Sequence, residues 1–316
     1  THFGGIFSNF LVDAVKEAEL IKGGFNAEYG GRLSAVLNVL SREGNRNYFQ
    51  GKTSISLLSA QTTMEGPFYN GAWLLSARRT YFDYLLPKIL PAETAEKIPP
   101  YYFYDLQGHV FSDLNEKDRI SVSIYRGIDD LIFDNLGLTA DWGNNTYSLS
   151  FRRVFNEKLV GNFLVASSEF FTNFNLGGDD GLNSENKILD QTLSANLTFF
   201  QSSDLEWRTG AQIKQLDFKY LNTFLEDTSF YIGENPIEAG FYTKLKWKGF
   251  SRFIIEPGLR YNYYSVYSST PYIDLRLGAK YLLTDDRYIN IALGNYHQFI
   301  QTVQDDYNPT ILDSWL

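Results

Sequence analysis

The sequence predicts an all-β membrane protein: part of an antiparallel transmembrane β-barrel, preceded by the end of a small α/β element. Three observations predict this class. Apolar and polar side chains alternate with a period of two from about residue 48 onward, short and long connections alternate, and many strand-like runs are longer than the strands of water-soluble proteins. No run of about 18 or more apolar residues occurs, so a membrane-spanning helix is not available.

The composition excludes several other classes. The 316 residues include 28 Lys and Arg against 37 Asp and Glu, a net charge of -9, which argues against a nucleic-acid partner because phosphates require a clustered basic surface. The absence of Cys excludes zinc-thiolate and iron-sulfur sites. With 44% hydrophobic and 21% charged residues, the chain is expected to fold rather than remain disordered.

Residues 1–47 predict a small mixed α/β element rather than barrel wall. SNFLVDAV at 8–15 favours a helical turn, VKEAELIKGG at 15–24 a short strand that ends in glycines, and RLSAVLNVLS at 32–41 a second strand. The polar, turn-rich REGNRN at 42–47 has the composition of a linker. We therefore expect a boundary between a unit at 1–47 and a second unit at 48–316.

The second unit predicts long strands with one apolar face. In RISVSIYRG at 119–127, Ile120, Val122 and Ile124 alternate with polar residues. The same alternation recurs further along the chain, at 189–199, 253–263 and 273–281. Crossing the hydrocarbon takes roughly 9 to 11 tilted residues, whereas globular strands average about 5 to 6. Predicted runs that reach or exceed the crossing length are 101–113, 159–175, 205–222, 252–266 and 288–302.

The predicted connections differ in length on the two sides of the sheet. The short polar turns are expected at 69–71, 115–118, 156–158, 202–204, 248–251 and 284–287. The longer connections are expected at 83–100, 127–144, 176–186 and 223–236, and residues 91–98 of the first favour a helical turn with Pro91 at its start. Up-and-down barrels of outer membranes have this asymmetry between short periplasmic turns and long external loops.

A family resemblance rests on the junction between the two units. GGFNAEYGGRLSAVLNVLSREGN at 23–45, followed by FQGKTSISLL at 49–58 and MEGPF at 64–68, resembles the plug-to-barrel junction of TonB-dependent outer-membrane receptors of the Bacteroidetes group. The resemblance implies that residues 1–47 are the C-terminal part of a plug domain and 48–316 the N-terminal part of the barrel. About thirteen strands are expected here, of about 22 in a plugged transporter barrel.

The resemblance also implies site residues and partners. Contacts between plug and barrel are expected from Glu28, Tyr29, Gly30, Gly31, Arg32 and Asn38, with Glu28 and Arg32 in ionic contacts, the glycines in a tight turn and Asn38 at a strand edge. Ligand contact is expected from the loop residues Tyr84, Tyr101, Tyr102 and Asp179. The implied partners are the inner-membrane TonB complex, outer-membrane lipids, a surface lipoprotein lid, and a small-molecule, glycan or peptide ligand.

The function that the resemblance implies is capture of a scarce ligand at external loops and import into the periplasm of a Gram-negative bacterium through plug rearrangement. The alternative is a barrel that serves as a docking platform for a surface lipoprotein or a secretion assembly. Neither hypothesis requires an enzyme, a cofactor or a bound metal. The acid-rich loop at 177–186 lacks the spacing of a calcium loop and favours a solvated external loop.

Few residues indicate catalysis. His2, His109 and His297 are isolated, and no nucleophile elbow, phosphate loop or dinucleotide-binding loop is present. A barrel hydrolase would require a Ser beside His109 on a neighbouring strand. The run Lys244, Lys246 and Lys248 predicts charges on one strand face, which either line a stripe for an anionic ligand or, as we favour, pair with acidic groups of the wall or plug.

Overall fold

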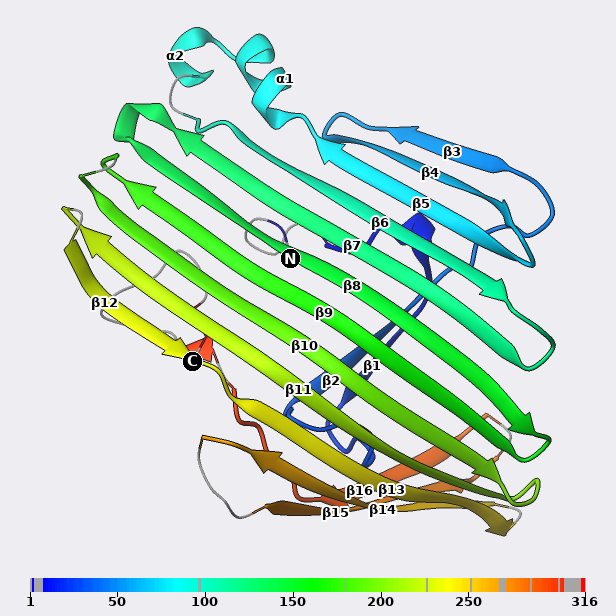
Figure 1. Ribbon diagram of the computed structural model, residues 1–316. Coiled ribbons are helices and arrows are strands. Elements are labelled where there is room, and N and C mark those ends of the chain that lie inside the picture. Colours follow the sequence, from blue (N-terminus) through cyan, green and yellow to red (C-terminus); the bar gives the residue numbers. More distant parts are fainter. Residues whose placement is uncertain are drawn as a thin grey trace.

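The fold is almost entirely β, as seen in a computed structural model that describes residues 2, 8–95, 98–178, 180–225, 227–250, 252–266, 271–284, 286–300, 302–303 and 314–315 (Figure 1). In these residues, no helix has both the length and the apolar composition needed to cross a membrane. The predicted all-β class with antiparallel neighbours is confirmed.

A single sheet of 14 strands makes up most of the molecule, and strands adjacent in the chain are also adjacent in the sheet, except that β12 and β13 both pair with β11. Its strands are β3 (Gln50–Ile55), β4 (Ser59–Phe68), β5 (Gly71–Thr80), β6 (Tyr101–Asp113), β7 (Asp118–Phe133), β8 (Leu138–Asn156), β9 (Leu159–Leu176), β10 (Leu182–Phe200), β11 (Leu205–Phe224), β12 (Asp227–Glu234), β13 (Ile237–Phe250), β14 (Phe253–Tyr264), β15 (Tyr272–Leu282) and β16 (Tyr288–Gly294). The short strand β12 pairs with the upper part of β11, while β13 pairs with its lower part. Figure 1 shows a broad, twisted wall.

The remaining elements are small. A hairpin of β1 (Val15–Lys22) and β2 (Ala35–Ser41) forms its own sheet, and Figure 1 shows it against the middle of the wall. The others are η2 (Val12–Ala14), α1 (Phe82–Ile89), α2 (Ala92–Ala95), η3 (Asp134–Leu136), β17 (Thr302–Val303) and β18 (Ser314–Trp315). The hairpin and the preceding short helix occupy the stretch in which the sequence predicts two strands and a helical turn.

One face of the wall, the outer face, is apolar and exposed. Leu75, Val122, Leu149, Leu193 and Leu275 belong to this face on five different strands, and the exposed fractions of Leu193 and Leu275 are 57% and 61%. Water around such a continuous band would be unfavourable by about 25 cal/mol for each Å² of apolar surface. The band therefore requires an apolar surrounding.

The opposite face, the inner face, is polar and largely buried. Thr63, Asp105, Ser194, Lys244 and Arg276 are each less than a tenth exposed and alternate along their strands with residues of the apolar band. This arrangement is the inverse of a water-soluble sheet, which buries its apolar face. Ion pairs and hydrogen bonds, described below, compensate the buried charges.

The predicted short turns are confirmed except at 248–251, where β13 continues to Phe250, and four other boundaries are wrong. The connections expected at 176–186 and 223–236 are shorter, because β10 begins at Leu182 and β12 (Asp227–Glu234) lies within the second. Residues 127–144 were expected to form a long loop, yet β7 and β8 continue to Phe133 and from Leu138, so that only four residues connect them. The run at 288–302 was expected to be one strand, yet β16 ends at Gly294.

The differences at 127–144 and 288–302 have a physical reason. Residues 127–144 contain Asp129, Asp130 and Trp142, which break the apolar alternation, but backbone pairing such as Asp129 with Trp142 continues the ladder above the apolar band. After Gly294 the chain leaves the sheet because its aromatic side chains pack on the inner face. The ring of Phe299 stacks on Tyr264, with centroids 4.9 Å apart.

Candidate functional site

Residues 26–31, the docked segment, lie against the inner face where four strands carry cationic side chains. Arg208 of β11 is opposite Lys244 of β13, which is opposite Gly258 of β14, which is opposite Arg276 of β15. We call Arg208, Lys244 and Arg276, together with Arg260 of β14, the cation row. The missing side chain of Gly258 leaves the space in which the docked segment enters this row: a Cβ at Gly258 would lie 2.8 Å from the Cβ of Ala27.

The carboxylate of Glu28 forms the charged contacts of the docked segment. Its Oε2 lies 3.0 Å from Nζ of Lys244 and 3.6 Å from a guanidinium nitrogen of Arg208. The side chain of Lys244 is 7% exposed, so its ammonium group depends on this carboxylate. The predicted ionic role of Glu28 toward the wall is thus consistent with the geometry.

Two arginines of the cation row hold the backbone of the docked segment. Arg260 Nη1 donates to the carbonyl oxygens of Ala27 and Glu28, at 3.4 and 3.2 Å. Arg276 Nη1 donates to the carbonyl oxygen of Asn26 at 2.7 Å and also to that of Tyr29. Four consecutive carbonyl groups therefore have charged donors from the wall, which are stronger than neutral ones.

The two glycines of the docked segment allow this close approach. A Cβ at Gly30 would lie 2.1 Å from Nε of Arg260, so any side chain there would displace the guanidinium. Gly31 has φ +69, a left-handed conformation that glycine adopts without strain, and a Cβ there would lie 3.0 Å from Oε1 of Glu238. Gly30 thus allows close approach without a positive φ, Gly31 has one, and the tight turn at these glycines stays a prediction.

A second set of side chains orients the arginines. Asp274 accepts a hydrogen bond from Nη2 of Arg276 at 2.8 Å and one from Nδ2 of Asn262 at 3.0 Å. The amide oxygen of Asn262 in turn accepts from Nε of Arg260 at 2.7 Å. With the docked segment in place, Asp274, Asn262 and Arg260 are at most 2% exposed, and their hydrogen bonds fix the orientation of the two arginines.

Tyr29 stays neutral in this environment. Burial, followed by the charge of Glu28 and a hydrogen bond to it, raises the pKa of Tyr29 to about 12. The phenol is therefore a hydrogen-bond donor throughout the physiological pH range, and it does not add a negative charge beside Glu28.

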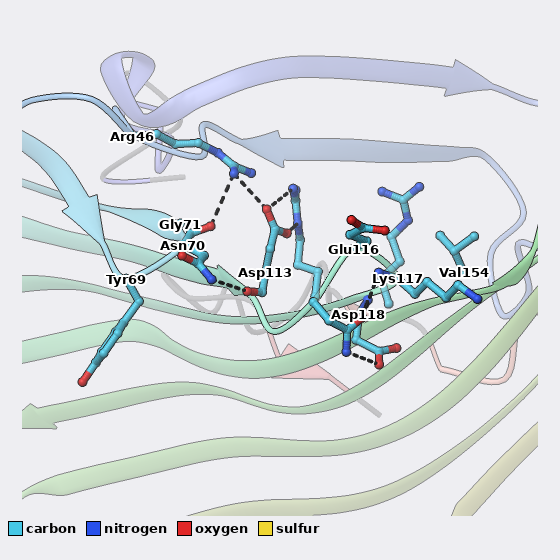
Figure 2. Close-up of a pocket in the computed structure, with 12 residues that line it drawn as sticks. Arg46, Tyr69, Asn70, Gly71, Asp113, Glu116, Lys117, Asp118 and Val154 are labelled. Atoms are coloured by element: carbon cyan, nitrogen blue, oxygen red, sulfur yellow. Dashed lines mark hydrogen bonds and ion pairs between the residues drawn. The ribbon is translucent and has the colours of Figure 1, made fainter.

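The linker at 42–47 is fixed to the wall at the end with the short turns. Arg46 contacts Asp113 at 2.8 Å, and Asp113 also accepts from Arg119, which pairs with Glu43 at 2.9 Å. Arg46 and Asp113 line an open cavity of about 720 Å³, and Figure 2 shows the contact between their side chains. The side chain of Arg42 reaches the buried Glu65 at 2.6 Å. The stretch predicted to be a linker is therefore held by ion pairs.

Two other predicted contact residues have local partners. Arg32 is exposed, and its Nη1 donates to the carbonyl oxygen of the adjacent Gly31 at 2.7 Å. Asn38 is exposed on β2, where it is paired with Glu19 of β1. The roles of Arg32 in an ionic contact and of Asn38 at a strand edge stay predictions.

The predicted ligand-contacting residues are on different surfaces. Tyr84 is 60% exposed on α1, with the ammonium group of Lys88 3.5 Å from its ring centroid. Tyr101 faces inward, where its hydroxyl donates to Asp129, whereas the next residue, Tyr102, faces outward and donates to Asp130 at 3.1 Å. Asp179 lies outside the described residues. Tyr101 alone of these combines a position on the inner face with an aromatic surface.

His109, the lysines of β13 and the acidic side chains are the groups from which the sequence suggested chemistry or ion pairing. His109 Nδ1 lies 2.9 Å from Oγ of Ser123 on the adjacent strand, but this pair is on the inner face rather than at the apolar band. Lys244 pairs with Glu28 and Lys246 with Glu256 at 3.3 Å, which confirms the favoured interpretation for these two lysines, while that of Lys248 stays a prediction. Within the described residues, no group of three or more acidic or histidine side chains is placed to hold a metal ion.

Sequence reasoning did not select the arginines of the cation row as contacts of residues 26–31. The sequence did indicate the face on which two of them lie: Arg260 and Arg276 alternate with the apolar residues of their strands and so belong to the inner face. The alternation does not predict which groups these arginines bind, because the acceptors are backbone carbonyl groups.

No family model and no curated protein matches the sequence. Solved structures do match. FpvA of Pseudomonas aeruginosa, in complex with a heterologous iron-bound pyoverdine, is 13% identical, with a TM-score of 0.69 over 93% of this chain and 47% of that one. The alcaligin outer-membrane receptor FauA of Bordetella pertussis is 12% identical, with a TM-score of 0.66 over 86% and 48%. The copper transporter OprC is 12% identical, with a TM-score of 0.61 over 91% and 51%.

These likenesses establish the fold of the chain. The wall of 14 antiparallel strands is the same arrangement that forms the barrels of these receptors and of the transporter. The chain spans about half the length of the solved structures it matches.

Proposed function

We propose that this chain is part of a TonB-dependent receptor of the Gram-negative outer membrane, which captures a scarce ligand and imports it when a plug leaves the barrel wall. The observation that carries the proposal is the docked segment: residues 26–31 are held on the inner face of a receptor-like wall by the cation row. The likeness to outer-membrane receptors supports it through the fold.

In this proposal residues 1–47 are the C-terminal part of the plug and 48–316 the N-terminal part of the barrel. The separate sheet of β1 and β2, and the start of the wall at Gln50, support this division. The outer face contacts lipid, since its exposed apolar band is the surface that hydrocarbon stabilises. Strands such as β10 and β11, with 19 and 20 residues, exceed the crossing length and project beyond the membrane.

The contacts of the docked segment suit a plug that must move. Hydrogen bonds and ion pairs lose their strength over a short displacement and are replaced by bonds to water, whereas the wall keeps its own backbone ladder. A pull from the inner-membrane TonB complex on the plug would release Glu28 and the four carbonyl groups from the cation row. The network around Asp274 would keep Arg260 and Arg276 ready for return.

Ligand capture is assigned to the end of the barrel with the longer connections. Tyr84, Tyr101, Tyr102 and Asp179 remain the proposed contacts there, and Tyr101 stacks at 6.3 Å on Trp142 to form an aromatic surface on the inner face. Because the structural neighbours include a receptor in complex with iron-bound pyoverdine and a copper transporter, ferric siderophores and copper are the first probes.

A reversible tether tests the proposal. Cysteines at Ala27→Cys and Gly258→Cys would be adjacent, because their Cβ atoms come within 2.8 Å before any adjustment. In cells, oxidation should abolish uptake of the imported probe, and a reductant should restore it. The matched control is Ser121→Cys with Ser150→Cys, opposite each other within the wall, which should leave uptake unchanged.

The probe panel comprises ferric siderophores, copper, cobalamin and oligosaccharides, measured in strains with and without the inner-membrane TonB machinery. Uptake that requires this machinery and is blocked by the tether supports the importer. Uptake that neither requires the TonB machinery nor is blocked by the tether would contradict the importer hypothesis. Under the alternative, a docking platform, binding of a surface lipoprotein persists in the strain without TonB and in the tethered protein.

A further inference from the structure

The inner face carries a second occupied site, on β6 and β7, where His2 lies between two carboxylates. Its Nε2 is 2.9 Å from Oδ1 of Asp105, and its Nδ1 is 2.7 Å from Oδ2 of Asp129. His2 is 2% exposed, and the side chains of Asp105 and Asp129 are 0% and 4% exposed. We call Asp105, Asp129 and the ring of Phe103 the acidic site.

The acidic site has a flat floor. The imidazole of His2 stacks on Phe103, with centroids 3.9 Å apart and an angle of 11° between the planes. The carboxylates meet two different ring nitrogens, so they contact the edge of the ring while Phe103 contacts its face. A planar group with donors at its edge matches this geometry, and a tetrahedral ammonium group does not.

The charges of the acidic site favour a cation. Arg78 of β5 pairs with Asp105 at 2.5 Å and lies 4.9 Å from the ring centroid of Phe103, so Arg78, Asp105 and Asp129 together carry one net negative charge. A protonated imidazole places a positive charge between the two carboxylates, and burial of the site strengthens this attraction. The hydroxyl groups of Tyr101 and Tyr125 donate to Asp129 and Asp105, which orients both carboxylates.

The protonation of His2 agrees with this balance. Burial by itself lowers the pKa of His2, but the hydrogen bonds and negative charges of Asp105 and Asp129 together outweigh burial, and the pKa is raised above its ordinary value of 6.5. The site therefore selects the charged form of the ring.

We propose that the acidic site is a binding site of the wall for a planar cation, such as an imidazolium, guanidinium or amidinium group, and that His2 occupies it as an internal ligand. The inference deepens the proposed function: when the plug segment that carries His2 leaves, the wall presents this site to the same chemical group on the imported ligand. It differs from the cation row, which binds carbonyl groups and a carboxylate.

The test is to empty the acidic site and refill it. In His2→Gly, in detergent at about pH 6 where imidazole is protonated, calorimetric titration should show saturable binding of imidazole. Pyrazole has the same ring size but is neutral, and tetramethylammonium is charged but not planar. Pyrazole and tetramethylammonium should each bind His2→Gly at least about tenfold more weakly than imidazole does. Imidazole should also bind at least about tenfold more weakly to the protein in which His2 is in place.

Second variants in the His2→Gly background identify the site. Asp129→Asn should weaken imidazole binding at least about tenfold, and Phe103→Leu should weaken it with both carboxylates left in place. Asp130→Asn is the matched control, because Asp130 is the next residue of β7 but pairs with Tyr102 on the outer face. It should leave binding unchanged.

Equal binding of pyrazole and imidazole would overturn the inference, as would an absence of saturable imidazole binding in folded His2→Gly. Equal effects of Asp129→Asn and Asp130→Asn would also overturn it. These measurements use purified protein and need no transport, whereas the tether at Ala27 and Gly258 tests import. Failure of one is therefore distinguishable from failure of the other.

Discussion

The N-terminal residues meet the wall in two regions that use opposite chemistry. In the first, the cation row holds residues 26–31 through four backbone carbonyl groups and the carboxylate of Glu28. In the second, the acidic site holds the single side chain of His2. The wall supplies cations on β11 and β13 to β15 and carboxylates on β6 and β7.

This difference determines what each region responds to. Carbonyl groups are present whatever the side chain, so the first region depends on the close approach of the backbone and on the ion pairs of Glu28 with Lys244 and Arg208. The second region depends on one ring and its proton, so it responds to pH and to competing cations. Mutations can therefore test the first region, and titration can test the second.

The largest effect is expected from Gly30→Ala. The added Cβ would lie 2.1 Å from Nε of Arg260, a buried guanidinium that cannot move without losing its bond to Asn262. The free energy of local opening of residues 26–31 should fall by about 3 kcal/mol, as for other losses of a buried network. Hydrogen exchange of these residues, followed by mass spectrometry, measures it.

Gly278→Ala is the matched control for this change. Gly278 lies on β15 two residues after Arg276, and a Cβ there would lie 3.6 Å from its nearest neighbour, an ordinary contact. Exchange of residues 26–31 should then change by less than about 0.5 kcal/mol. If residues 26–31 exchange equally fast in Gly30→Ala and Gly278→Ala, close approach of the backbone at Gly30 does not hold the docked segment.

Glu28→Gln should have the second largest effect. The substitution keeps the size of the side chain but leaves the ammonium group of Lys244, 7% exposed, without its carboxylate. Local opening of residues 26–31 should become easier by about 2 kcal/mol. Hydrogen exchange of the same peptide reports the change directly.

A double-mutant cycle separates the ion pair from other effects of this substitution. Adding Lys244→Met should recover part of the loss, with a coupling energy of about 1 to 2 kcal/mol. Lys246→Met is the comparison, since Lys246 is two residues away and pairs with Glu256 of the wall instead. No coupling between Glu28 and Lys244 would mean that the carbonyl contacts alone hold the segment.

The faces of the wall could be predicted from the sequence because alternation is a local property. Ile120, Val122 and Ile124 belong to the outer face as expected, and the intervening residues face inward. Gly30 and Gly31 could be selected because two adjacent glycines before a strand indicate a tight turn. For Glu28, the sequence indicated an ionic contact but not its partners, which are more than 170 positions further along the chain.

The strand ends and the acidic site could not be predicted. Above the apolar band polar and apolar side chains occur on both faces, with Asp130 facing outward and Trp142 inward, so the pattern that marks a strand disappears at 127–144 although the ladder continues. His2 is an isolated histidine in the sequence, and only the fold brings it to Asp105 and Asp129. Contacts between residues more than 100 positions apart leave no periodic signal.

The smallest expected effect concerns the proton of His2. Because its pKa is raised in the folded protein, the protonated ring stabilises the folded state fully below the ordinary pKa of 6.5, and this contribution is lost as the pH rises through the raised pKa. Each unit of difference corresponds to about 1.4 kcal/mol. NMR titration of ring-labelled histidine should show a midpoint above 6.5 for His2.

The titration also sharpens the comparison of the two regions. Asp129→Asn removes one of the charges that raise the pKa of His2, so the midpoint should fall, while Asp130→Asn, on the outer face, should leave it in place. Hydrogen exchange of residues 26–31 should not follow this titration, because their partners are Lys and Arg side chains. If exchange of that segment did follow the proton on His2, the two regions would open as one unit, and release of the plug would depend on pH.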